Sequence, residues 1–187
     1  MAGAVHAGVL RVIDRVRAGA LPPLVMPWDI WHTVRHTDDP SPLETLFQRG
    51  ARKLGIDLFE DLRARFTADA IGRMHIELPI LSHYQDPKAR AGQAFHELAH
   101  AVGWLTGELT AWQTDEQYAL EECAAELTSC EVRARLGQLR EVDVNWSATY
   151  IGHWADKGGD PRAGLEYALE QAPVRADLIL EVCNGSA

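Results

Sequence analysis

Residues 95–100, with the sequence FHELAH, lie in an otherwise apolar run of helical periodicity that decides how the chain is interpreted. His96 and His100 are four residues apart, so on a helix they share one face and can direct imidazole nitrogens at one point. Zinc binds nitrogen ligands at about 2.0 to 2.1 Å, which this geometry allows. Glu97 is rotated by about 100° from His96 and can flank an ion without binding it. This HExxH pattern therefore predicts a zinc-binding helix with Glu97 as the general base acting on water.

The motif requires a third ligand, because a catalytic zinc site normally combines three protein ligands with one water. A capping box at Thr114 and Gln117 predicts that the next helix spans residues 115–136. Glu122 and Glu126 stand one turn apart beside the apolar stripe of that helix. Because unpaired charge is costly to bury, a metal and its histidines are the partners we expect for these carboxylates. We therefore predict that Glu122 binds the zinc and that Glu126 hydrogen-bonds a ligand histidine.

Other residues near these motifs receive weaker assignments. The competing pattern HExxHxxGxxH is matched through His100 and Gly103, but Thr106 stands where its third histidine belongs. His153 is a fallback ligand, although its apolar helical context is more typical of a core residue. Glu121 points at a different angle from Glu122, and we expect it on a solvated face.

The composition indicates one globular domain, or a domain with a small appendage: 187 residues, 47% hydrophobic and 24% charged. We expect no membrane association, because no stretch approaches the ~20 apolar residues that span a bilayer. Charged residues interrupt residues 1–20, so we predict no signal peptide and a cytoplasmic location. The 3 cysteines form no CxxC pair, which indicates neither a disulfide framework nor a thiolate zinc site.

The net charge of -9 is unevenly distributed along the chain. Residues 1–95 hold 12 Lys or Arg against 11 Asp or Glu, whereas residues 96–187 hold 6 against 16. Nucleic-acid affinity depends largely on Lys and Arg displacing counterions from phosphates. Nucleic acid is therefore an improbable partner, and any such contact, including one to single-stranded DNA, would have to use the first half.

The remaining segments are organised around one short strand. An amphipathic helix over residues 3–18 precedes an extended, proline-rich connection over 20–42, which Trp28 and Trp31 are expected to anchor. Ser41 and Glu44 form a capping box that opens a helix ending near residue 54. Residues 74–78 alternate in polarity and precede a proline, which predicts a strand near a sheet edge that could pair with an extended substrate. The other helices are predicted over residues 89–106, 145–157, 161–172 and 174–183.

Three groups of segments resemble one known family. They are residues 76–79 (IELP) with 94–100 (AFHELAH), residues 118–127 (YALEECAAEL), and residues 150–154 (YIGHW) with 160–163 (DPRA) and 176–180 (ADLIL). Together they are similar to the zincin-like metallopeptidase domain of ArdC-type antirestriction proteins and of phage or plasmid polyvalent proteins. The resemblance implies an α+β, mostly helical zincin-like fold with a short sheet and an active-site helix. It also implies a gluzincin-like site whose carboxylate ligand falls on Glu122.

The predicted domain organisation follows from where this resemblance begins. We expect residues 64–187 to form the zincin-like metallopeptidase domain. Residues 1–63 comprise the N-terminal helix, the proline-rich arm and a further helix. Within them, residues 12–23 and 27–28 resemble the start of the single-stranded-DNA-binding domain that precedes the peptidase in ArdC. The rest of that domain has no recognisable counterpart, so this region is interpreted as a remnant and DNA binding is not carried over.

The predicted activity is zinc-dependent hydrolysis of a peptide bond in a protein or peptide substrate. Glu97 would take a proton from the zinc-activated water and pass it to the leaving amine. Tyr118, Tyr150 and His153 are the candidate donors to the developing oxyanion. Two alternatives stay open: a non-catalytic, zinc-stabilised module that binds a protein partner, as in antirestriction, and an unrelated helical protein with a fortuitous motif and no metal.

Overall fold

The computed structural model describes residues 5–19, 21, 24, 41–84, 86–108 and 114–185. Helices α1 (Ala7–Ala18) and α2 (Pro42–Lys53) precede three short strands, β1 (Ile56–Glu60), β2 (Arg65–Ala68) and β3 (Met74–Leu78). A short 3-10 helix, η2 (Leu81–His83), leads to α3 (Pro87–Leu105), α4 (Asp115–Arg135), α5 (Glu141–Lys157) and α6 (Pro161–Asn184). The predicted class, α+β and mostly helical with a short sheet, is confirmed. Most of the proline-rich connection, including Trp28 and Trp31, lies outside the described residues.

Side-chain caps begin several of these helices, two of them where the sequence predicted a cap. Ser41 accepts a hydrogen bond from the backbone N–H of Glu44, and Thr114 accepts one from that of Gln117. Asp86 caps α3 by accepting from two backbone N–H groups of its first turn. Such caps satisfy N–H groups that have no partner within the helix, so they locate helix starts from local sequence alone.

The sheet differs from the prediction. Its strand order is β1-β3-β2, with β1 parallel and β2 antiparallel to β3. The strand at residues 74–78 is therefore central, and the expectation that it lies at an edge and pairs with substrate is wrong. Pro79 does not disturb the ladder because it follows the last paired residue, Leu78. The predicted division at residues 63 and 64 stays a prediction, but one sheet joins β1 before this point to β2 and β3 after it.

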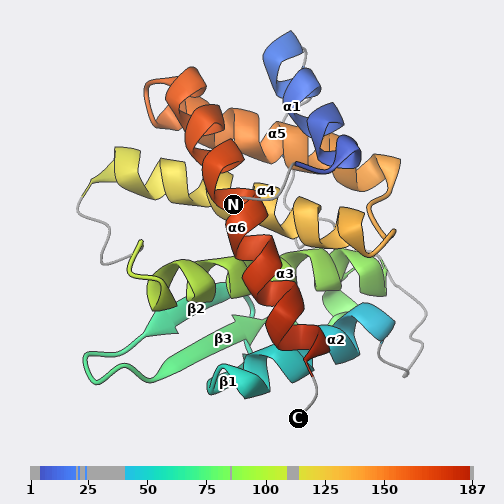
Figure 1. Ribbon diagram of the computed structural model, residues 1–187, viewed down its shortest axis with the longest axis vertical. Coiled ribbons are helices and arrows are strands. Elements are labelled where there is room, and N and C mark those ends of the chain that lie inside the picture. The colour runs from blue at the N-terminus through green and yellow to red at the C-terminus, as the bar shows by residue number, and fades with distance from the viewer. Residues whose placement is uncertain are drawn as a thin grey trace.

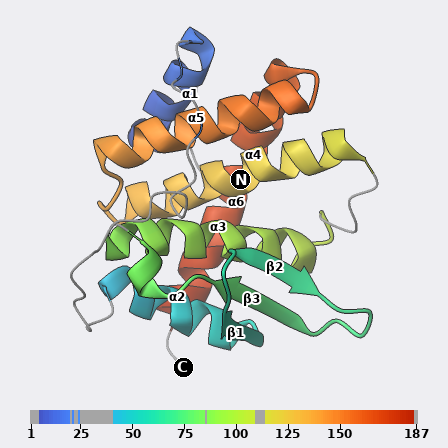
Figure 2. The ribbon, with the colours of Figure 1, turned by 180° about the vertical axis from the view of Figure 1, so that it is seen from behind.

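Two hydrophobic clusters hold the elements together, and α4 and α6 contribute to both. The first joins the inner face of the sheet to α2, α3, α4 and α6, and the second joins α1, α4, α5 and α6. In Figures 1 and 2, α3 lies between the sheet and α4, while α5 and α1 cover the far side of α4. Helix α4 is consequently central: every residue from Glu121 to Ala134 is buried.

Helix α6 is continuous, whereas the sequence predicted a break at Pro173. Proline lacks the N–H that would bond to the preceding turn, and in a helix interior it costs about 3 kcal/mol. Packing offsets this cost, because Ala168, Ala172 and Ala176 are buried on α6, which packs along α4. One uninterrupted helix therefore runs past Pro173 and carries Arg175 toward α4.

The described helices give no sign of a membrane segment, since none combines the length and apolarity that crossing a bilayer requires. The cysteines Cys123, Cys130 and Cys183 are all buried and unbridged. Burial raises the pKa of Cys123 and Cys130 to about 12, so their thiols are inert near neutral pH. They act as small core residues.

Candidate metal centre

Helices α3 and α4 pack side by side and bring His96, His100 and Glu122 together. One ligand atom from each residue lies within 4.8 Å of the other two. The two Nε2 atoms of the histidines are 3.1 Å apart. Glu122 places Oε2 at 3.3 Å from Nε2 of His96 and Oε1 at 3.7 Å from Nε2 of His100. These side chains are almost fully buried, with 3% to 4% of each residue exposed.

The orientation of the rings shows that this cluster fits a divalent cation. Each Nδ1 donates a hydrogen bond to a carboxylate, so the proton of the neutral ring stays on Nδ1 and Nε2 is the nitrogen that can bind an ion. Both Nε2 atoms and the Glu122 carboxylate face one point. Ligands held at about 2.1 Å by a tetrahedral ion are about 3.4 Å apart, and the observed 3.1, 3.3 and 3.7 Å bracket that separation.

Two further carboxylates on α4 orient the histidines. Oε2 of Glu126 accepts from Nδ1 of His96 at 3.0 Å, the kind of contact that the sequence predicted for this residue. Oε1 of Glu121 accepts from Nδ1 of His100, also at 3.0 Å. The expectation of a solvated Glu121 is therefore wrong: 2% of the residue is exposed. An apolar stripe defines a solvated face only when the rest of the helix surface is free, and α4 is buried on all sides from Glu121 to Ala134.

The charges of the cluster support one another. Burial lowers the pKa of His96, but Glu122 and Glu126 outweigh this effect and raise the pKa well above its usual value. Burial raises the pKa of Glu122, but His96, His100 and Tyr150 outweigh it and lower the pKa to about 2. Without a metal, a protonated His96 therefore faces an ionised Glu122. A bound cation would take the place of that proton and keep the carboxylate paired with positive charge.

Glu97 follows His96 on α3 and is 4% exposed. Burial raises the pKa of its carboxyl group above the usual value, although the nearby histidines act in the opposite direction. A raised pKa makes a carboxylate a stronger base near neutral pH. Among the described residues, the convergent ligand atoms belong to His96, His100 and Glu122, so Glu97 lies beside this cluster of ligands without being part of it.

Aromatic side chains border the cluster on the side of α5. The hydroxyl of Tyr150 donates to Oε2 of Glu122 at 2.5 Å, and its ring lies 5.5 Å from that of His96. Tyr118 also hydrogen-bonds Glu122, and its ring contacts Trp154 edge to face. His153 is exposed and lies outside the group of convergent ligands, so the structure supports it neither as a fallback ligand nor as a core residue.

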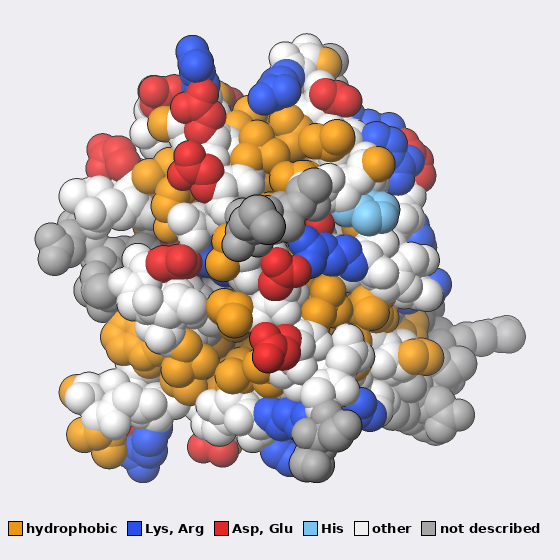
Figure 3. All heavy atoms as spheres, viewed as in Figure 1, with side chains coloured by type: hydrophobic (Ala, Val, Ile, Leu, Met, Phe, Trp, Pro, Cys, Tyr) orange, Lys and Arg blue, Asp and Glu red, His pale blue; other side chains and the backbone are white. Residues whose placement is uncertain are grey.

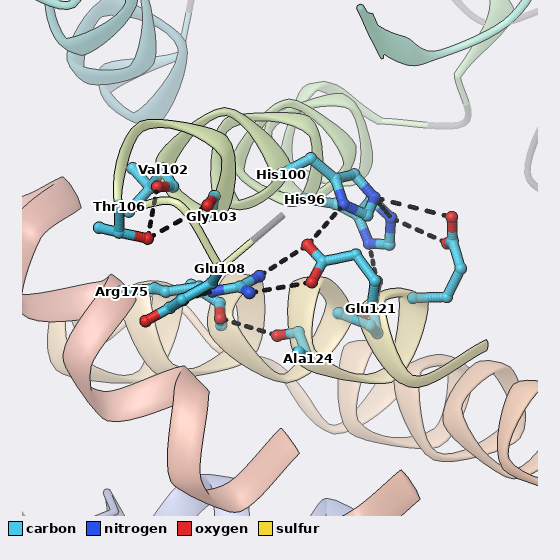
Figure 4. Close-up of polar contacts among 12 residues, drawn as sticks. His96, His100, Val102, Gly103, Thr106, Glu108, Glu121, Ala124 and Arg175 are labelled. Atoms are coloured by element: carbon cyan, nitrogen blue, oxygen red, sulfur yellow. Dashed lines mark hydrogen bonds and ion pairs between the residues drawn. The ribbon is translucent and has the colours of Figure 1, made fainter. Parts of the chain in front are cut away.

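Thr106 is the residue that caps the C-terminus of α3, and it does not belong to the cluster of metal ligands. Its hydroxyl donates to the backbone carbonyls of Val102 and Gly103, as Figure 4 shows. The same view shows a residue that sequence reasoning missed. Arg175 of α6 reaches the carboxylate of Glu121. No local signal could have found it, because Arg175 and Glu121 are 54 residues apart.

Comparisons with known proteins agree with this architecture. No curated protein matches the chain. Two crystal structures of the antirestriction protein ArdC from plasmid R388 are similar in fold. The Mn(II)-bound structure has a TM-score of 0.55 and 21% identity, and covers 83% of this chain and 57% of that one. The metal-free structure has a TM-score of 0.54 and 20% identity, covering 83% and 55%. The chain thus spans little more than half the length of ArdC.

The sequence itself places the domain in a family. Residues 52–160, more than half of the chain, match MPTase-PolyVal, a family described as zincin-like metallopeptidase. The matched region contains all three strands and the helices α3, α4 and α5 that build the metal centre. The chain therefore belongs to the zincin-like metallopeptidase family.

Proposed function

We propose that this protein is a zinc-dependent peptidase in which His96, His100 and Glu122 bind the metal and Glu97 is the catalytic base. The observation that carries the proposal is the convergence of two Nε2 atoms and one carboxylate beside a buried glutamate. Two histidines and one glutamate form the ligand set of a known class of catalytic zinc sites. The Mn(II)-bound ArdC structure supports a divalent ion in this fold.

When bound, the ion supplies Lewis-acid polarisation of the scissile carbonyl and lowers the pKa of water toward neutrality. The chain's own groups then handle the proton. Glu97 takes it from the attacking water and returns it to the leaving amine, a role typically worth 10²- to 10⁴-fold in rate. Its buried surroundings favour this role, because burial raises the pKa of its carboxyl group.

Tyr150 and Tyr118 are the proposed donors to the developing oxyanion, since both hydroxyls lie at Glu122. They also hold the Glu122 carboxylate in place before substrate arrives. An extended peptide would have to add to an outer strand of the sheet, because β3 is paired on both sides. The substrate we propose is a protein or peptide, with an antirestriction role like that named for ArdC.

Glu97→Gln tests the catalytic assignment. The variant keeps the shape of the side chain but cannot accept the proton, so we expect stoichiometric zinc and a loss of hydrolysis of at least about 10²-fold. Zinc is measured by elemental analysis, and new fragments are sought by mass spectrometry after incubation with candidate proteins. His100→Ala is the matched comparison, in which both zinc and hydrolysis should be lost. Full activity of Glu97→Gln on a substrate that the wild-type protein cleaves would exclude Glu97 as the base.

One observation favours the second candidate function, a zinc-stabilised module that binds a protein without cutting it. The ligands and Glu97 are each at most 4% exposed in the part of the chain that the structure describes. A site so enclosed stabilises the fold, whereas hydrolysis requires a path for the substrate. Stable complex formation without fragments, unaffected by Glu97→Gln, would select this function over the peptidase.

The proposal includes neither nucleic acid nor a membrane as a partner. On the face in Figure 3, acidic and basic side chains are interspersed, and no continuous basic tract marks a path for a phosphate backbone among the described residues. The second half of the chain is strongly acidic, with 16 Asp or Glu against 6 Lys or Arg. We further propose a cytoplasmic location, which the three unbridged cysteines favour.

A further inference from the structure

Arg175 is the largest fully buried side chain of the molecule among the described residues, with 0% exposure. We propose that it is a positioning residue, which orients the metal ligand His100 by fixing the carboxylate of Glu121. The inference rests on the proposed metal site and concerns metal binding, so it can be tested without any assay of hydrolysis.

The contact between Arg175 and Glu121 is bidentate. Nη1 donates to Oε1 at 2.7 Å, and Nη2 donates to Oε2 at 2.9 Å. Oε1 is also the atom that accepts from Nδ1 of His100 at 3.0 Å, so one oxygen links the guanidinium to the ligand (Figure 4). Two parallel hydrogen bonds fix the plane of a carboxylate as well as its position. The fixed carboxylate of Glu121 in turn fixes the orientation of the His100 ring, because it accepts the hydrogen bond from Nδ1.

The surroundings of Arg175 are shaped around its guanidinium. A Cβ atom on Gly103 would lie 2.9 Å from both Cζ and Nη2, so any larger residue at this position of α3 would displace the guanidinium. The third donor, Nε, contacts Oε2 of Glu108 at 3.2 Å. Because α6 continues through Pro173, the arginine reaches this gap from the helix that packs along α4. The buried guanidinium of Arg175 and the space left by Gly103 on α3 therefore serve to hold the carboxylate of Glu121.

The other histidine is oriented by different means, which makes the role of Arg175 specific. Glu126, which holds His96, accepts from the hydroxyl of Ser147. Its ion pair is with Nη2 of Arg133, at 3.7 Å and without a bidentate contact. Loss of Arg175 should consequently disturb the orientation of His100 and leave that of His96 unchanged.

The test compares zinc affinity and the visible spectrum of the cobalt-substituted protein in Arg175→Met, Arg175→Lys and the wild-type protein. Loss of an outer partner of a metal ligand typically weakens metal binding by about 10- to 100-fold. We expect this loss in Arg175→Met, with a shifted cobalt spectrum. Arg175→Lys keeps the charge but cannot make the bidentate contact, so its zinc affinity should lie between those of Arg175→Met and the wild-type protein.

Arg135→Met is the matched control. Arg135 also joins α4 to α6, through Asp177, and pairs with Glu131 within α4, but it contacts no metal ligand among the described residues. The substitution should lower the free energy of unfolding and leave the zinc affinity and the cobalt spectrum unchanged. A merely structural role for Arg175 predicts that Arg175→Met behaves in the same way, and that result would overturn the proposal.

Gly103→Ala is a second, smaller perturbation that keeps Arg175 in the chain. Its added methyl group displaces the guanidinium, so we expect weaker zinc binding in the wild-type background and no further effect in Arg175→Met. Wild-type affinity in both Gly103→Ala and Arg175→Met refutes only the role of Arg175. If the wild-type protein binds zinc but hydrolyses no substrate, only the proposed peptidase activity is refuted.

Discussion

Replacing Glu122 by Gln in the metal-free protein tests how strongly the neighbouring side chains stabilise this carboxylate. The pKa of Glu122 is lowered from 4.5 to about 2 in the folded protein, because contacts with His96, His100 and Tyr150 outweigh the effect of burial. At about 1.4 kcal/mol per unit, this difference corresponds to about 3 kcal/mol of folding free energy. Glu122→Gln should remove a contribution of this order at neutral pH.

The direction of the shift fixes the pH dependence. Because the folded-state pKa is lowered, the stabilisation is complete above the unfolded-state value of 4.5 and is lost as the pH falls toward about 2. Linkage predicts that about 2 kcal/mol of it disappears between about pH 6 and about pH 3. The difference in unfolding free energy between the wild-type protein and Glu122→Gln should shrink by that amount over this window.

Urea unfolding followed by circular dichroism, with a chelator present at each pH, measures this difference. Glu166→Gln is the control, because Glu166 forms a surface pair with Arg162 and 56% of its side chain is exposed. Its difference from the wild-type protein should be small at every pH. A gap between the wild-type protein and Glu122→Gln that stays constant from about pH 6 to about pH 3 would refute the reasoning.

Three other predictions concern the metal and the packing around it. Removing zinc from the loaded protein should lower the melting temperature by about 8 to 16 °C when free zinc had been about 1,000 times its dissociation constant, which calorimetry with and without chelator measures. Tyr150→Phe removes the hydrogen bond to Glu122 and should weaken zinc binding by about 10-fold in a chelator competition, whereas His153→Ala, an exposed position, should leave it unchanged. Gly92→Ala places a Cβ 2.8 Å from Nη1 of Arg133 and should destabilise the fold by about 1 to 3 kcal/mol in urea, so an unchanged midpoint would contradict the close packing.

Features that depend on neighbours a few residues away follow from the amino-acid sequence alone. The spacing of His96 and His100 places them on one helix face in any fold that keeps the helix. The caps at Ser41 and Thr114 mark helix starts because the hydrogen bonds they make are local. The mostly helical class follows from the same periodicity. The pairing of Glu122 with this site rested on weaker ground, since it required two helices to meet.

Which polar groups face each other across the core depends instead on tertiary packing. Strand β1 carries two apolar residues in succession, Leu58 and Phe59, and β2 has only 4 residues, so neither shows the clear alternation of β3 in the sequence. Pairing with β3 determines their place in the sheet. The single apolar stripe of α4 predicts a solvated Glu121, but α3 and α6 cover the remaining faces of the helix. The partnership of Glu121 with Arg175 likewise depends on α6 continuing past Pro173. Such contacts arise from long-range packing, in which chain segments meet at distances along the sequence that no local pattern encodes.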